Sequence, residues 1–304
     1  AWRALEQSAP GEVSVAGLTD TAKLLVTALA QRTLGRPVIF VVGSNRRAEA
    51  LAEPLRFFHS LLAGPDSAGV VTLPAYDQSP YRGLSPHPAI VAARGVGLWR
   101  LATGQAALAV VPVGALLQRY QEREVYAALA RTVRRGDAVG LEDLVGYLES
   151  VGYERAEPVE MAGQYSVRGG IVDVFPPEAS HAIRMELFGD TLEELRAFDP
   201  ATQRSVGPMT EAVFLPLTEV SRRQEFLRQL WASKEGGEPA GEAPSYSVSA
   251  FPGWEFLVPL VMRPEKSLLD LAPRALVVFD EPESLREQAR EFWDKLEAEY
   301  AARK

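Results

Sequence analysis

The feature that most constrains the fold is a short apolar run at residues 38–42, VIFVV, enclosed between Pro37 and Gly43. No polar residue interrupts this run, and β-branched residues dominate it, which is typical of a strand buried on both faces of a parallel sheet. Amphipathic helices are predicted on either side of it, at 20–34 and 46–62. This alternation of helix and strand indicates an α/β fold.

The same rhythm continues toward residue 120. Apolar strands are predicted at 70–73 and 107–112, with a helix at 89–102 between them. Short buried strands that alternate with helices favour a parallel, doubly wound sheet. We therefore expect a first α/β domain over residues 1–120.

The pattern changes after this point. Helical stretches are predicted at 116–129 and 141–151, followed by β-rich segments at 164–177, 182–189 and 192–198 that suggest an antiparallel meander. Along 183–188 the apolar period is two, so Ile183, Met185 and Leu187 should face one side and Arg184, Glu186 and Phe188 the other. Residues 121–211 are therefore expected to form a separate β-rich α+β domain.

The last third returns to α/β character. It holds a predicted strand at 212–217, a helix through Trp231, a further strand at 275–279 and a charged helix from Glu283 onward. The Gly- and Pro-rich stretch 234–247 is predicted to be a surface loop. Residues 212–304 are expected to pack back on the first domain, so that the β-rich domain is an insertion.

Composition excludes several kinds of site. The chain has no cysteine and three histidines, which excludes disulfides and cysteine zinc sites and argues against any metal site. A net charge of −8 argues against a broad surface that neutralises DNA phosphates. No apolar run approaches the ~20 residues of a membrane span. A soluble cytoplasmic protein without a membrane partner is the expectation.

Residues 17–24, GLTDTAKL, follow the spacing of a phosphate-binding loop, G-x-x-x-x-G-K-[ST]. Two chemical requirements fail. Ala22 replaces the second glycine that lets the backbone approach phosphate, and Leu24 replaces the hydroxyl that holds Mg²⁺. Gly17 and Lys23 alone cannot build a nucleotide site, so the motif is interpreted as degenerate, with Thr19 or Asp20 capping a helix.

Residues 276–281, LVVFDE, are predicted to form a buried strand that ends in Asp280 and Glu281, like the Walker B element that holds Mg²⁺. Acidic residues also start turns and cap helices, and Pro282 fits a helix start. We expect no catalytic residue, no metal and no cofactor in this chain. The two motifs together indicate a helicase-type ATPase sheet, derived from a P-loop NTPase, that has lost its catalytic groups.

Three ordered segments, GQYSVRGGIVDVFPP (163–177), IRMELFGD (183–190) and FDPATQRS (198–205), closely resemble the UvrA-binding domain shared by UvrB and the transcription-repair coupling factors. Two more, LPAYDQSPYRGLSPH (73–87) and VVPVGALLQR (110–119) with Arg94 between them, resemble the coupling factors rather than UvrB. The resemblance implies domains like 1a, 2 and 1b of UvrB over 1–120, 121–211 and 212–304.

Departures from the pattern favour the coupling factor. UvrB has an intact phosphate-binding loop and a long aromatic hairpin that probes damaged DNA, whereas here the loop is degenerate and only Tyr76 and Tyr81 occupy the corresponding region. The start at Ala1 and the charged end at 291–304 suggest a piece of a longer protein, and the resemblance implies that this piece is its N-terminal part. In that family the parent is an ATP- and Mg²⁺-dependent DNA translocase that displaces stalled RNA polymerase through other domains.

The resemblance also implies partner-binding residues. In the family, basic and aromatic residues of the β-rich domain contact UvrA, and the matching positions are Arg168 beside Gly169 and Gly170, then Arg184, Phe188 and Arg196. An arginine beside an exposed aromatic is typical of an interface hot spot. Alternatively, these arginines bind Glu186 or Asp190 of the chain itself. The Gly-Gly pair is predicted to be a bulge that re-aims Arg168, although an ordinary kink would serve equally well.

The sequence thus predicts a non-catalytic, UvrB-like module that recruits UvrA to stalled RNA polymerase. A residual ATP- or DNA-binding helicase-type domain is the first alternative. The second is an autoinhibitory module, in which a C-terminal domain of the parent covers the same face.

Overall fold

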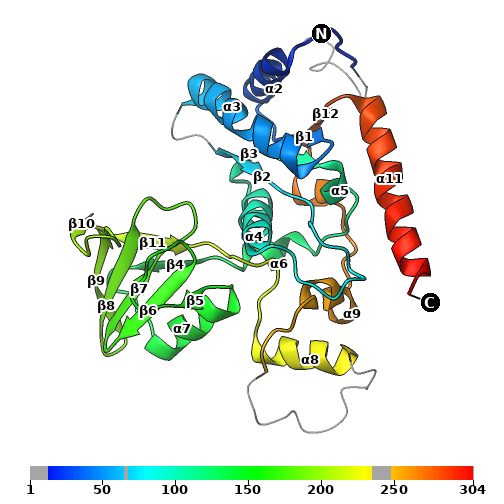
Figure 1. The fold of residues 1–304 in the computed structure, drawn as a ribbon. Helices are drawn as coiled ribbons and strands as arrows, with labels where there is room; N and C mark the ends of the chain where they lie inside the picture. Colours follow the sequence, from blue (N-terminus) through cyan, green and yellow to red (C-terminus); the bar gives the residue numbers. More distant parts are fainter. Residues whose placement is uncertain (1–12, 65–67, 235–247, 304) are drawn as a thin grey trace. The chain divides into compact units, whose positions relative to one another are not determined.

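The computed structural model describes residues 13–64, 68–234 and 248–303, and the chain divides into two compact units (Figure 1). The first unit comprises Ala1–Arg82, Arg100–Arg123 and Pro264–Lys304, and the second comprises Gly83–Trp99 and Glu124–Arg263. We refer to them as the α/β unit and the β-rich unit. The predicted loop 235–247 lies outside the described residues.

A four-stranded parallel sheet in the order β12-β1-β3-β2 forms the centre of the α/β unit. Every residue of β1 and β3 is buried, as the uninterrupted apolar runs predicted. β12 pairs with β1 on one side, so the last strand completes a sheet that the first strand begins. The four strands are β1 (Val38–Val42), β2 (Gly69–Thr72), β3 (Ala106–Pro112) and β12 (Leu276–Phe279).

Helices accompany this sheet, and the bounds of α2 agree with the capping residues in the sequence. α2 (Asp20–Leu34) begins after Thr19, whose side chain accepts from the Ala22 N–H, and ends at Gly35 in the left-handed conformation. Leu24 and Ala28 of α2 pack with Leu51 and Leu55 of the next helix in the buried cluster on β1. The remaining helices are α3 (Asn45–Ala63), α4 (Pro88–Thr103, whose last turn belongs to this unit), α5 (Val113–Leu116), α10 (Leu268–Leu271) and α11 (Pro282–Ala301).

The prediction of a helical stretch at 116–129 is wrong for the middle of that stretch. α5 ends at Leu116, and Tyr120 instead exchanges two backbone hydrogen bonds with Lys266, at 2.9 and 3.0 Å. The Tyr120 hydroxyl also donates to the Ala115 carbonyl at 2.6 Å. These contacts occupy the backbone groups that a helix would need, and α6 (Arg123–Ala127) begins only after them.

A six-stranded sheet in the order β10-β9-β8-β7-β6-β5 dominates the β-rich unit. Its neighbouring strands pair antiparallel, as the predicted meander requires, except that β5 pairs parallel to β6. The strands are β5 (Glu154–Arg155), β6 (Gln164–Arg168), β7 (Ile171–Val174), β8 (Ala182–Phe188), β9 (Thr191–Phe198) and β10 (Ser205–Pro208). The sequence did not predict β5 or β10, which are short and carry little apolar pattern.

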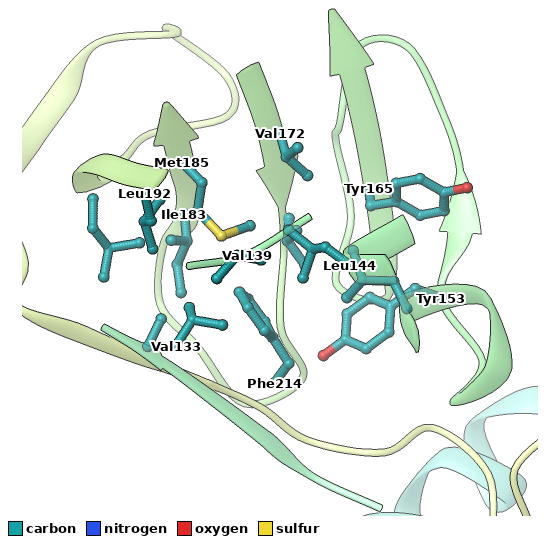
Figure 2. Packing of buried hydrophobic residues seen from close by; sticks show 14 of the residues in the cluster. Val133, Val139, Leu144, Tyr153, Tyr165, Val172, Ile183, Met185, Leu192 and Phe214 are labelled. Atoms are coloured by element: carbon teal, nitrogen blue, oxygen red, sulfur yellow. The ribbon is translucent and has the colours of Figure 1, made fainter. Parts of the chain in front are cut away.

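One face of this sheet packs on a hydrophobic core (Figure 2). Figure 2 shows Val133, Phe214 and Leu144 lying against Val172 and Met185 of the sheet. Ile183 and Met185 are buried in this core whereas Arg184 and Glu186 are not part of it, so the period of two predicted for this strand is confirmed. The elements that cover this face are α7 (Leu141–Ser150) and a two-stranded sheet of β4 (Arg131–Arg134) and β11 (Glu211–Phe214).

The rest of the β-rich unit is helical and contains a buried ion pair. Arg94 of α4 is almost fully buried and donates to Glu219 at 2.5 and 3.1 Å. Residues 83–99 and 212–263, which were expected in the α/β part, cluster with the β-rich unit. They include α8 (Gln224–Lys234), the 3₁₀ turn η1 (Trp254–Leu257) and α9 (Val258–Val261).

The core in Figure 2 yields a stability prediction. Phe214 is fully buried among the residues of this cluster, so Phe214→Ala should lower the free energy of unfolding by about 3–5 kcal/mol through lost contacts and a residual cavity. Chemical denaturation followed by circular dichroism measures this change. Val213→Ala, on the exposed side of the same strand, is the control and should cost less than about 1 kcal/mol. Equal costs at the two positions would contradict the assigned core.

Candidate protein-interaction face

Charged side chains gather on the sheet face opposite the hydrophobic core of the β-rich unit, which we call the outer face. Strand register places Asp173, Arg184 and Arg196 side by side in one row. The next row along the strands holds Ile171, Glu186 and Glu194. Cations and carboxylates therefore alternate on the outer face, within reach of one another across the strands.

Asp173 and Arg184 form the centre of this arrangement. The guanidinium of Arg184 donates from Nε to Asp173 Oδ1 at 2.6 Å and from Nη2 to Asp173 Oδ2 at 2.7 Å. It also lies 4.5 Å from the ring centroid of Phe198 and donates to Gln203. The hydrogen bonds from Arg184 to Asp173 raise the pKa of Arg184 above its ordinary value, so this guanidinium stays charged at any physiological pH.

The predicted arginines differ in how much of each side chain is exposed to solvent. Arg184 is 15% exposed, whereas Arg168, at the end of β6, is 47% exposed. Arg168 donates from Nη2 to Asp173 Oδ2 at 3.1 Å, and across the described part of the chain no hydrogen bond engages its Nε or Nη1. Arg168 therefore presents donors to solvent, and Arg184 is held mainly within the protein.

Arg196 is bound by two carboxylates of its own sheet. It donates to Glu186 of β8 and, at 2.7 Å, to Glu194 of β9. Pairing with Glu186 was one of the intramolecular contacts considered from the sequence. The other two arginines pair with Asp173, which sequence reasoning did not single out. A lone acid in the apolar stretch Ile171–Val174 was the available signal, because a buried charge needs a partner.

Phe188 is the most exposed large apolar residue among those described, with 77% of its surface accessible. It ends β8, and the preceding Leu187 donates its N–H to the Gly170 carbonyl at 2.8 Å. The end of β8 is therefore level with the turn that follows Arg168. Phe188 and Arg168 lie at the same end of the outer face.

The Gly169-Gly170 pair is a two-residue hairpin turn, and the prediction of a bulge is wrong. Arg168 pairs directly with Ile171 across the turn, and Gly169 has a φ of 60°. At Gly170 an added Cβ would lie 2.5 Å from the Leu187 carbonyl oxygen, so no side chain fits. Gly169 therefore serves the left-handed conformation of the turn, and Gly170 serves the close approach of β8. The register shift in this region is in β8–β9, between Glu186 and Leu187.

The degenerate phosphate-binding motif lies in the α/β unit, where its residues have structural roles. Gly17 precedes α2, with a φ of 78°, and Ala22 is in the first turn of the helix. Leu24, in place of the metal-binding hydroxyl, is buried in the core on β1. Thr19 is the N-cap, as expected from the sequence.

Lys23 is paired with the two acidic residues that follow β12. Its Nζ lies 2.8 Å from Asp280 Oδ1 and 2.5 Å from Glu281 Oε1. Burial alone would lower the pKa of Lys23, but the hydrogen bonds to these carboxylates outweigh it and raise the pKa above its ordinary value. The two motifs predicted separately from the sequence thus meet in space.

Arg47, which was not predicted, completes this ion-pair network. It donates to Asp280 Oδ2 at 3.0 and 3.1 Å and to both carboxylate oxygens of Asp20 at 2.6 Å. The hydrogen bond from Arg47 holds the pKa of Asp20 below its ordinary value. Two cations therefore face three carboxylates, and a phosphate that approached Lys23 would meet excess negative charge.

The structure describes residues 13–64, 68–234 and 248–303. Within these ranges no group of three or more His, Asp or Glu side chains is arranged to hold a metal ion. No helix there is long and apolar enough to cross a membrane.

Comparison with known proteins agrees with this geometry. The family model of the UvrB interaction domain matches residues 132–219, the segment that contains the outer face. The chain is 31% identical to the transcription-repair-coupling factor of Myxococcus xanthus over 98% of its length. It is 28% identical to that of Escherichia coli over 75% of its length and 27% identical to that of Bacillus subtilis over 70%.

These alignments cover 26%, 19% and 18% of the three relatives, so the chain spans about a quarter of their length or less. The match to the interaction domain and the matches to coupling factors concern overlapping parts of one chain. The chain is accordingly an N-terminal UvrB-homology module of the transcription-repair coupling factor family, with its UvrB interaction domain at residues 132–219.

Proposed function

We propose that this chain is a non-catalytic docking module that recruits UvrA during transcription-coupled nucleotide excision repair. The observation that carries the proposal is that the exposed ring of Phe188 and the half-exposed guanidinium of Arg168 lie at the same end of the outer face, on strands separated by β7. Both residues lie inside the segment that matches the UvrB interaction domain. The names of the relatives link this segment to the coupling of transcription and repair.

An exposed aromatic ring beside arginine suits a protein partner. Burying a phenylalanine side chain removes a large apolar area from water, worth about 1.5–3 kcal/mol. Aromatic residues and arginine are enriched among the side chains that dominate binding energy, and a guanidinium pairs well with carboxylates through parallel N–H donors. Arg168 and Phe188 supply these two contributions at the same end of the outer face.

The ion-pair network supports a non-catalytic role. In a working P-loop enzyme the lysine contacts phosphate, and the acidic residue after the neighbouring strand holds Mg²⁺. Here Lys23 contacts Asp280 directly, across 257 positions of sequence. The lysine that would bind phosphate and the carboxylate that would bind Mg²⁺ are therefore bound to each other. This arrangement fits a helicase-like sheet that descends from a P-loop NTPase and no longer binds nucleotide.

The remaining functions belong to the proposed parent protein. A coupling factor would engage DNA and RNA polymerase and use ATP and Mg²⁺ through domains other than those of this chain. A C-terminal domain of the parent could cover the outer face until polymerase is engaged, which would make the module autoinhibitory as well. The exposure of Phe188 in the isolated chain is the observation that favours a covering partner of some kind.

The docking proposal predicts that Phe188→Ala and Arg168→Glu each weaken binding of UvrA at least tenfold. The first removes the apolar contact and the second reverses the charge offered to the partner. Biolayer interferometry with immobilised chain and soluble UvrA measures the affinity, and circular dichroism checks the fold. Phe57→Ala and Arg134→Glu, at exposed aromatic and arginine positions outside the outer face, are the controls. Unchanged affinity in both test variants refutes the proposal.

A measurement of nucleotide binding distinguishes a non-catalytic module from a residual ATPase. Because carboxylates neutralise Lys23 and Arg47, calorimetric titration with Mg-ATP at millimolar concentration should give no saturable heat. The ATP-binding alternative predicts saturable heat that Lys23→Met abolishes. That pattern would refute a non-catalytic module even if UvrA bound normally.

A further inference from the structure

We infer that Asp173 is a positioning residue of the proposed UvrA-binding face, which fixes Arg168 and Arg184 in the geometry that an acidic side chain of the partner requires. This inference rests on the proposed function. Asp173 itself is 3% exposed, so it acts through the two arginines and not by contact with the partner.

The contacts of Asp173 show how one carboxylate can orient two cations. Oδ1 accepts from Arg184 Nε at 2.6 Å. Oδ2 accepts from Arg184 Nη2 at 2.7 Å and from Arg168 Nη2 at 3.1 Å. The two guanidinium groups come from β6 and β8, and Asp173 lies on β7 between them. It therefore joins the strand that carries the exposed arginine to the strand that ends in Phe188.

The backbone gives Asp173 little freedom. Its neighbours Val172 and Val174 are buried in the core on the opposite face of the sheet, and strand register fixes it against Ser166 and Arg184. A buried carboxylate is costly unless charged partners surround it, so the arginines are drawn toward it. Arg184 is further held by its contact with the Phe198 ring.

The trio of Asp173, Arg168 and Arg184 carries a net charge of about +1, because two cations share one anion. In the described residues, the donors without a hydrogen bond are Nε and Nη1 of Arg168 and Nη1 of Arg184. These N–H groups suit a carboxylate of the partner. Holding the arginines in place before binding avoids part of the entropic cost of ordering these side chains when the partner binds.

Asp173→Asn tests this role because it keeps the shape of the side chain and removes its charge. If Asp173 only offset the arginine charges, the variant would be more cationic and would bind an acidic partner more tightly. If Asp173 positions the arginines, the variant should bind UvrA about tenfold more weakly, since an amide N–H group then faces a guanidinium. The two readings therefore predict changes of opposite sign.

The measurement is the affinity of the full chain for UvrA, with a double-mutant cycle between Asp173→Asn and Arg168→Ala. We expect Asp173→Asn to have a much smaller effect when Arg168 is already alanine. Asp143→Asn is the matched control, because Asp143 accepts from Arg131 at 2.7 Å on α7, away from the outer face, and it should leave affinity unchanged. Arg184→Lys, which keeps the charge but loses the paired hydrogen bonds, is the second variant if Asp173→Asn fails to fold, and it should weaken binding as well.

Three outcomes would overturn the inference: wild-type affinity, tighter binding, or an equal loss with and without Arg168. In each case Phe188→Ala reports on the underlying proposal separately. Loss of binding in Phe188→Ala together with normal binding in Asp173→Asn leaves the docking function intact and removes only the role of Asp173. Normal binding in Phe188→Ala, Arg168→Glu and Asp173→Asn alike removes the docking function itself.

Discussion

The ion pair between Lys23 and Asp280 joins α2 to the residue that follows β12 in the α/β unit. Asp280 is buried, so it must be paired, and Lys23 and Arg47 both meet this requirement. The same residues would serve nucleotide and metal in a working P-loop protein. Their mutual pairing satisfies these charges within the unit and joins α2 and α3 to the end of β12.

A second buried carboxylate organises the β-rich unit in a related way. Asp173 is paired with two arginines, but one of these cations remains half exposed. The α/β unit uses its ion pairs for internal cohesion, whereas the outer face retains free donors beside an exposed ring. This difference separates the structural part of the module from the part that we propose binds UvrA.

Local signals in the sequence predicted much of the fold. Thr19 and Gly35 set the bounds of α2, and continuous apolar runs identified β1 and β3, because caps and burial act within a few residues. The stretch at 116–129 failed because Tyr120 pairs with distant Lys266. Arg47 and Asp173 were missed for the same reason, since their partners come from other elements. The family resemblance, not periodicity, pointed to Arg168 and Phe188.

The pairing of β12 with β1 has a consequence for synthesis on the ribosome. About 240 residues separate the two strands, and the whole β-rich unit lies in the intervening sequence. At ribosomal rates of roughly 5–20 residues per second, β12 is synthesised about 12–48 s after β1. During this interval the apolar strand lacks one side of its sheet and is open to wrong pairing, while the unit encoded after it has already emerged and can fold.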